Sequence, residues 1–175
     1  ANNSQSSFGS LLSSTSASIS LKRICRTVHM TTSLTRKAKW LLTKNPNIML
    51  SFDYDIAFIW ANRFGHLNIV EWFCSNKKLD DDCYNMGFLS ACQNGYLEVA
   101  KFILQTIPTI NLSYLDNGAF RLACQNGHLN VAEWLLQIIP TINIFEQEDY
   151  SFVEACGNGH LHVAKWLMSL RNKLN

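Results

Sequence analysis

Apolar residues recur along the chain in pairs of short segments with helical spacing. Residues 119–126, AFRLACQN, are short and apolar enough for one helix. Gly127 follows, and a positive φ at this glycine would end the helix and turn the chain. After Ala132, apolar side chains fall at i+3, i+4 and i+7, at Leu135, Leu136 and Ile139. Pro140 is expected to end this second helix, because proline lacks the backbone N–H that a helix needs. The segment therefore predicts a helix, a turn, a second helix and an extended loop.

This pattern recurs with a period of about 32 residues. The turn glycines are spaced 30, 32 and 32 residues apart, at Gly65, Gly95, Gly127 and Gly159. Residues 91–112 read ACQNGYLEVAKFILQTIPTINL and residues 123–144 read ACQNGHLNVAEWLLQIIPTINI, so 15 of 22 positions are identical. One helix pair cannot bury its apolar side alone, whereas stacked pairs can. The repeat therefore predicts an all-α solenoid of stacked units rather than one globular core.

We expect about five units, preceded by a Ser-rich tail over residues 1–20 that is expected to be disordered. Residues 21–50 form a degenerate first unit, in which Ser33 stands at the turn position and the second helix is strongly basic. A polar end unit is expected where the stack meets water. The other units span 51–82, 83–114, 115–146 and 147–175, and together they form the repeat domain over residues 51–175.

The residues NGHLNVAEWLL, preceded by LAC, and NGHLHVAKWLM, preceded by EAC, resemble ankyrin repeats. The repeat sequence, with Trp in the second helix and PTINI after it, is similar to ankyrin repeats of giant DNA viruses. One departure is that the family's usual TPLH reads GAFR at 118–121 and MGFL at 86–89, so its hydroxyl–imidazole network is missing. The resemblance implies a protein–protein interaction module, acting as an adaptor or scaffold. The alternative is a structural component of a larger, viral assembly.

Catalytic and metal chemistry are not indicated. Cys92, Cys124 and Cys156 recur every 32 residues, but equivalent positions on stacked units lie about 8–10 Å apart, too far to share one zinc ion. Histidine also recurs directly after the turn glycine, without a nucleophile or a carboxylate at fixed spacing, and is expected to hydrogen-bond the neighbouring loop. No glycine-rich phosphate loop is present in the sequence. We therefore predict a protein that is not an enzyme and has no cofactor, metal or small-molecule substrate.

Three tryptophans, Trp72, Trp134 and Trp166, recur in the second helices. They would serve either as exposed anchors for a partner or as packing between units. The second interpretation is favoured.

Charge is unevenly distributed over the 175 residues. Residues 1–52 contain seven Lys or Arg and no Asp or Glu, and the remainder carries all 13 acids against eight bases. A basic, Ser-rich segment is also typical of a mitochondrial transit peptide, but the apolar spacing within 21–31 favours a capping helix. Nucleic-acid binding is not favoured, because no aromatic residue or motif accompanies these bases. No apolar run is long enough for a membrane span. Six cysteines without a secretory signal favour a reducing, cytoplasmic compartment, in the host cell or the virion if the protein is viral.

In the proteins that this sequence resembles, partners bind to the loop tips and to the exposed side of the first helices. Transferred to this chain, these positions are Asp53, Asp55, Arg63, Asp81, Asp82, Gln93, Tyr114, Leu115, Asp116, Asn117, Gln125, Gln147, Glu148 and Asp149. The acidic tips suggest a basic segment of a protein as the partner. The open alternative is that acidic loops only keep the solenoid soluble.

Overall fold

The computed structural model describes residues 40, 52–76, 79–139, 142 and 146–174, with the side chains of 52–54, 146–149 and 173–174 left aside. The tail and most of the expected first unit lie outside these residues, apart from Trp40, which is helical and exposed. The described chain beyond Trp40 forms four helix pairs. They are α3 (Phe52–Arg63) with α4 (Leu67–Asn76), α5 (Asp81–Gln93) with α6 (Leu97–Thr106), α7 (Tyr114–Gln125) with α8 (Leu129–Ile138), and α9 (Glu146–Gly157) with α10 (Leu161–Leu174).

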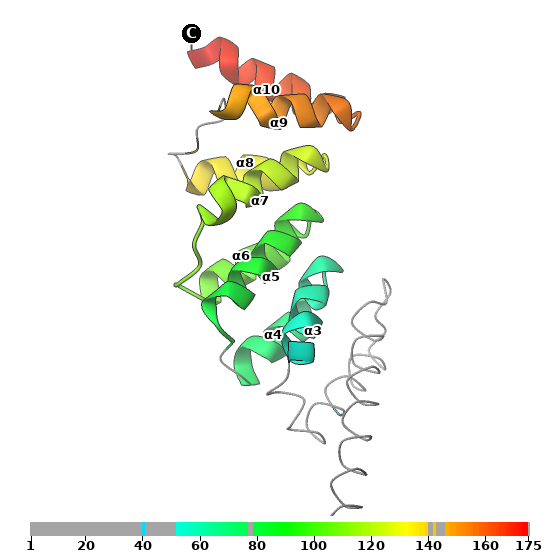
Figure 1. The fold of residues 1–175 in the computed structure, drawn as a ribbon, viewed down its shortest axis with the longest axis vertical. Coiled ribbons are helices and arrows are strands. Elements are labelled where there is room, and N and C mark those ends of the chain that lie inside the picture. The colour runs from blue at the N-terminus through cyan, green and yellow to red at the C-terminus, as the bar shows by residue number, and fades with distance from the viewer. Residues whose placement is uncertain (1–39, 41–51, 77–78, 140–141, 143–145, 175) are drawn as a thin grey trace, which may run out of the picture.

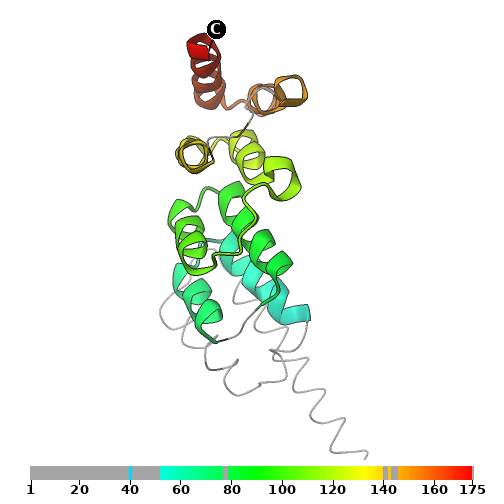
Figure 2. The ribbon, with the colours of Figure 1, turned by 90° about the vertical axis from the view of Figure 1, so that its left-hand side faces the viewer.

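The four pairs stack in chain order into a solenoid (Figure 1). The first helices, α3, α5, α7 and α9, pack on one another in sequence. When the helices are viewed close to end-on, these four helices form one column (Figure 2). The helices α4, α6, α8 and α10 form a second column beside it. The second helices end and the next first helices begin on one side of the stack, and the tight turns within pairs lie on the opposite side (Figure 1). The predicted all-α repeat solenoid is confirmed.

A glycine at positive φ ends each first helix. The φ values lie between 71° and 81° at Gly65, Gly95, Gly127 and Gly159. This geometry lets the next residue donate a backbone hydrogen bond into the end of the helix, as His128 N does to Ala123 O at 2.8 Å. Residues with a Cβ lose roughly 1–2 kcal/mol in this conformation. The sequence spacing of the glycines thus marks the helix ends correctly.

Three of these glycines also hold a ring from the following unit. A Cβ added at Gly65 would overlap the ring of Tyr96, one at Gly95 would overlap His128, and one at Gly127 would overlap His160. Gly159 has the same conformation, but nothing lies within 4 Å of its Cβ position. The ring-on-glycine contact is therefore a repeated contact between units, and the last unit lacks it.

Small residues and aromatic rings fill the space between units. Cys92 and Cys124, on consecutive first helices, are fully buried, as expected for packing residues. Trp134 of α8 lies 6.3 Å from Phe88 of α5, measured between ring centroids, and Trp166 of α10 lies 6.4 Å from the ring of Phe120 of α7. Each pair joins one unit to the next. The prediction that the tryptophans pack between units is confirmed for Trp134 and Trp166, whereas the ring contact of Trp72 is with Phe73 of its own helix.

α7 is assigned from Tyr114 to Gln125, but Leu115, Asp116 and Asn117 have left-handed dihedral angles, so its right-handed helix begins at Gly118. This agrees with the helix predicted over 119–126 to within one residue at each end. Backbone hydrogen bonds from Tyr114 to Asn111 and from Asn117 to Ser113 close a turn ahead of this helix.

The two reasons for glycine can be separated by comparing Gly127→Ala with Gly159→Ala. Both variants adopt the same unfavourable φ, which costs about 1–2 kcal/mol. Only Gly127→Ala must also displace the His160 ring, so we expect it to lose a further 1 kcal/mol or more, the typical cost of overpacking. The free energy of unfolding from denaturant titration measures the difference. Equal losses in the two variants would show that the ring contact contributes nothing to stability.

Candidate functional site

The predicted partner-binding positions lie at opposite ends of the first helices. Asp55, Asp81, Asp82 and residues 114–117 lie at the starts of these helices, next to the loops. Arg63, Gln93 and Gln125 are the last residues of α3, α5 and α7. A helix of 12 or 13 residues is about 18–20 Å long. The structure therefore divides the predicted set into two edges, which we call the tip edge and the hairpin edge.

Four members of the set are placed only by their backbone. Asp53 lies in the first turn of α3, and Gln147, Glu148 and Asp149 lie in the first turn of α9. Both segments belong to the tip edge, while the side chains of these four residues lie outside the described ones.

Hydrogen bonds hold the loop between α6 and α7 against α5. The side-chain oxygen Oδ1 of Asn85, which is buried, accepts a hydrogen bond of 2.9 Å from the backbone N–H of Asn111. The hydroxyl of Thr109 donates to Asp81 Oδ1 at 2.9 Å. Asp80 caps α5 by accepting a hydrogen bond of 2.6 Å from the N–H of Cys83. The loop before α7 is thus tied to the preceding unit, and Asp81 and Asp82 project from a capped helix start.

The turn at the start of α7 contains three consecutive residues in the left-handed region. Leu115, Asp116 and Asn117 have φ values of 53°, 54° and 57°. Asp and Asn adopt this conformation more readily than other residues with side chains, whereas leucine rarely does. Its backbone carbonyl accepts a hydrogen bond of 3.2 Å from Nη2 of Arg121. The turn presents Leu115 with 55% of its surface exposed, next to the exposed Asp116.

The guanidinium that holds this turn also contacts the next unit. The Cζ atom of Arg121 lies 5.3 Å from the centre of the Tyr150 ring on α9. This distance permits a cation–π interaction. Arg121 therefore links the turn at Leu115 to α9. Its charge is used in contacts with the Leu115 carbonyl oxygen and the Tyr150 ring.

On the hairpin edge, one predicted residue is used within the fold. Gln125 donates a hydrogen bond of 2.8 Å from Nε2 to Oε2 of Glu154, which joins α7 to α9. Arg63 is exposed and Gln93 is half-buried. The role of Gln125 in joining units has no counterpart in the sequence-based expectation.

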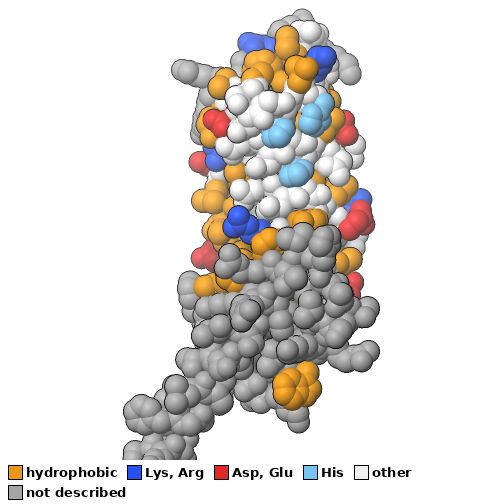
Figure 3. Space-filling model, turned by 90° about the vertical axis from the view of Figure 1, so that its right-hand side faces the viewer, with side chains coloured by type: hydrophobic (Ala, Val, Ile, Leu, Met, Phe, Trp, Pro, Cys, Tyr) orange, Lys and Arg blue, Asp and Glu red, His pale blue; other side chains and the backbone are white. Residues whose placement is uncertain are grey.

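Three histidines gather on the hairpin edge (Figure 3). His128 forms a hydrogen bond with the backbone of Gln93 in the preceding turn, as the sequence predicted for this position. His162, to which the sequence assigns no role, places Nε2 2.8 Å from the carbonyl oxygen of Gly127. The rings of His160 and His162 are 6.2 Å apart, centroid to centroid. The spacing of two residues between His160 and His162 is the signal that could have indicated this grouping.

The environment of His128 favours its neutral form. Burial lowers the pKa of this imidazole below its usual 6.5, and the nearby His160 lowers it further. The hydrogen bond to the Gln93 backbone acts in the opposite direction.

Three of the described cysteines, Cys74, Cys92 and Cys124, are held in the protonated form by burial. Burial raises the pKa of Cys124 to about 12 and that of Cys74 to about 11, and it raises the pKa of Cys92 as well. These thiols stay protonated near neutral pH, which makes them poor nucleophiles and poor metal ligands. Among the residues that the structure places, no group of three His, Cys, Asp or Glu could hold a metal ion. None of the placed helices is long and apolar enough to cross a membrane.

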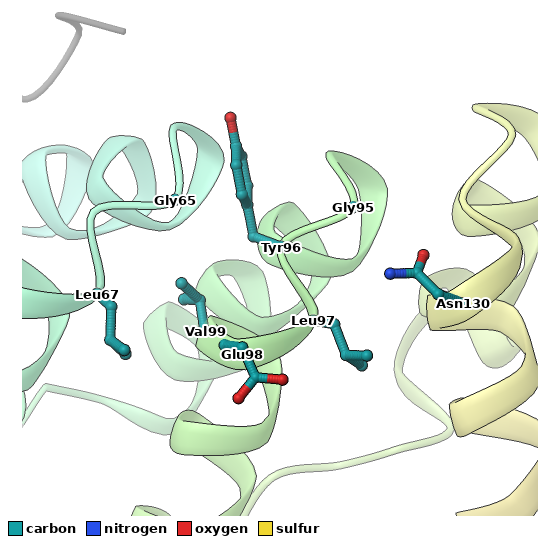
Figure 4. Close-up of a pocket in the computed structure, with 8 residues that line it drawn as sticks. All are labelled: Gly65, Leu67, Gly95, Tyr96, Leu97, Glu98, Val99 and Asn130. Carbon is teal, nitrogen blue, oxygen red and sulfur yellow. The ribbon is translucent and has the colours of Figure 1, made fainter. Parts of the chain in front are cut away.

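A shallow, open pocket of about 360 Å³ lies at the N-terminal ends of α4, α6 and α8 (Figure 4). The Tyr96 ring stands beside Gly65 at its edge, and Asn130 reaches toward it from α8. Glu98 is the carboxylate of the lining, and it is exposed and paired with Lys101 at 3.1 Å. A nucleophile and a base within hydrogen-bond reach of each other are not part of this lining.

The pH dependence of stability tests the environment of His128. Because its pKa is lower in the folded chain, the unfolded chain binds the proton more readily. The contribution of neutral His128 is fully present above about pH 6.5 and is lost as the pH falls from there to the folded pKa. We expect His128→Tyr, which copies Tyr96 at the equivalent position, to show a smaller decrease of unfolding free energy between pH 7 and pH 5. Denaturant titrations across this range measure the slope, and the same slope in both proteins would contradict the assignment.

Comparison with known proteins agrees with this geometry. The family described as ankyrin repeats (3 copies) matches residues 88–175, which is half of the chain. No curated protein matches the chain. The matched residues cover α6 to α10 and the last six residues of α5, and they include three of the four turn glycines. The chain belongs to the ankyrin-repeat family.

Proposed function

We propose that this chain is a recognition scaffold whose tip edge binds a basic segment of a protein partner. Ankyrin repeats are in general protein–protein interaction modules, and the proposal assigns the binding surface and the chemistry of the partner. The tip edge consists of residues 79–82 and 107–117 together with the starts of α3 and α9.

The observation that carries the proposal is that exposed, non-repeated residues stand on a fixed tip edge. Asp81, Asp82 and Asp116 are exposed. Hydrogen bonds to Asn85 and Asp81 hold the loop between α6 and α7 in place. Repeated residues such as Cys92 and Cys124 are instead fully buried and are used for packing. A surface that is already ordered loses little conformational entropy on binding.

The charge of the tip edge supports a basic partner. Residues 79–82 and 107–117 contain four Asp and no Lys or Arg, and residues 145–149 add three acids. Lys77 and Lys78 directly precede residues 79–82 in the sequence. Because their charges oppose those of the aspartates, Asp81 and Asp82 are needed to keep this segment acidic. Complementary charge of this kind raises association rates and selects among partners.

Leu115 gives the tip edge an apolar contact beside its acids. More than half of its surface is exposed. The hydrogen bond from Arg121 to its carbonyl oxygen holds the turn that displays it. We therefore expect the partner segment to combine basic residues with at least one large apolar side chain.

The cellular setting is part of the same proposal. Cys74, Cys92, Cys124 and Cys156 form no disulfide in the structure, which agrees with a reducing compartment such as the cytoplasm. The repeats resemble ankyrin repeats of giant DNA viruses, and this resemblance would place the scaffold in an infected host cell or in the virion. The alternative role, as a structural part of a larger assembly, is supported by the exposed Leu161 and Met168 on α10.

Charge reversal on the tip edge tests the proposal. The double variant Asp81→Lys, Asp82→Lys is compared with Glu98→Lys, Glu133→Lys, which changes the net charge equally on exposed positions of α6 and α8. Quantitative affinity capture from lysate, followed by titration of the captured protein, should show about a tenfold or larger loss of affinity for the tip variant only. The loss should shrink at high salt, because exposed charges are screened.

Melting curves of both double variants verify that each remains folded. Equal capture by the parent chain and the folded tip variant would contradict the proposal and leave the acidic tips with a role in solubility.

A further inference from the structure

The turn at the start of α7 differs from the equivalent segment one unit earlier. Residues 114–117 lie 32 positions after residues 82–85, the same offset that separates Gly127 from Gly95. Residues 82–85 belong to the first turns of α5 and none of them has a positive φ. Residues 115–117 are instead left-handed. Two neighbouring units therefore build the same place with opposite handedness.

The two forms differ in what they do with one side chain. Cys83 of α5 is buried, and its sulfur lies 3.9 Å from the carbonyl oxygen of Asp55 on α3. Leu115 stands at the equivalent position of α7 and exposes 55% of its surface. A right-handed turn over 114–117 would direct position 115 toward α5, as Cys83 is directed toward α3. The left-handed form thus displays Leu115, and the right-handed form would withdraw it.

The left-handed form is held by contacts from outside the turn. This conformation places the Cβ of a residue too close to the following carbonyl oxygen, so three such residues in succession are strained. Strain of this kind persists only where the surroundings enforce it. Arg121 donates a hydrogen bond of 3.2 Å from Nη2 to the carbonyl oxygen of Leu115, and its guanidinium lies 5.3 Å from the Tyr150 ring on α9. The form of the turn therefore depends on a side chain that is itself seated against the next unit.

Gly118 weakens the right-handed alternative. It directly follows the turn, at the position that Met86 occupies in α5. Glycine is a poor helix former, so extending α7 toward its N-terminus is less favourable than the same step in α5. A Cβ added at Gly118 would lie 3.2 Å from the Cβ of Leu115, so the left-handed form also uses the space that this glycine leaves. Strain acts against one form and glycine acts against the other.

We propose that residues 114–117 switch between this left-handed turn and a right-handed first turn of α7, and that Arg121 is the positioning residue that selects the left-handed form. The switch regulates the tip edge by displaying or withdrawing Leu115, and in this respect it rests on the proposed function. A partner that contacts the displayed Leu115 shifts the turn toward the left-handed form, because a ligand favours the state that it binds better.

Thiol labelling of a Leu115→Cys chain reports which form is populated. This substitution copies Cys83 at the equivalent position. Iodoacetamide is the probe, and peptide mass spectrometry reads position 115 separately from the natural cysteines. With Arg121 in place, we expect position 115 to react about as fast as the exposed Cys156. Arg121→Gln should slow the reaction at position 115 at least tenfold, because the right-handed form covers it.

Two substitutions at Asn117 serve as matched controls. Asn117→Gly added to Arg121→Gln should restore fast labelling, because glycine adopts a positive φ without steric cost. Asn117→Ala, with Arg121 in place, should slow labelling, because alanine disfavours the left-handed form at its own position. The buried Cys92 is read in the same experiment and reports any general unfolding.

The direction of the change decides the outcome. Unchanged or faster labelling in both Arg121→Gln and Asn117→Ala would overturn the proposal, because it would show that these substitutions only loosen the turn. Slow labelling that Asn117→Gly does not restore would overturn it as well.

The labelling uses the chain alone, so it tests the switch separately from the binding function. Titration of the protein that the tip edge captures should show about a tenfold lower affinity for Arg121→Gln and recovery when Asn117→Gly is added. Slow labelling with an unchanged affinity would overturn the role of the switch in recognition. The acidic tip edge would still be judged by the variants of Asp81 and Asp82.

Discussion

The structure depends on the contact that three of the turn glycines, Gly65, Gly95 and Gly127, make with a ring of the following unit. A short helix pair cannot bury its apolar side by itself, so each pair is stabilised through its neighbours. The glycine serves two purposes at this point, because it permits the positive φ of the turn and leaves room for Tyr96, His128 or His160. Aromatic pairs such as Trp134 with Phe88 extend the same contact across the stack. The sequence repeats because the interface between successive units requires the same residues at the same positions.

This division of labour separates structure from recognition. Repeated residues lie between units, and the residues that vary lie at the tips. The tips are nevertheless part of the framework, because Asn85 holds the loop before α7 and Arg121 holds the left-handed turn at Leu115. Exposed tip residues can thus change from unit to unit without altering the contacts that keep the stack together.

The fold could be predicted from the sequence because its determinants are local and periodic. The spacing of Gly65, Gly95, Gly127 and Gly159 marks the turns, and the i, i+3, i+4, i+7 pattern marks the second helices. The candidate site was harder to predict from the sequence, because the predicted partner-binding residues lie at both ends of the first helices. The hydrogen bond between Gln125 and Glu154 and the left-handed turn at Leu115 depend on neighbouring units. A pattern along one unit carries no signal for such contacts.

Native-state hydrogen exchange at the Asn111 amide tests most directly whether the packed units hold the tips in place. This N–H lies in a loop, but it donates to the buried Asn85 side chain. We expect it to exchange as slowly as amides within α5 and α7, with protection that falls when Asn85 is replaced by Ala. Exchange at the rate of an unstructured loop would contradict the view that this family member recognises its partner with a preformed tip edge.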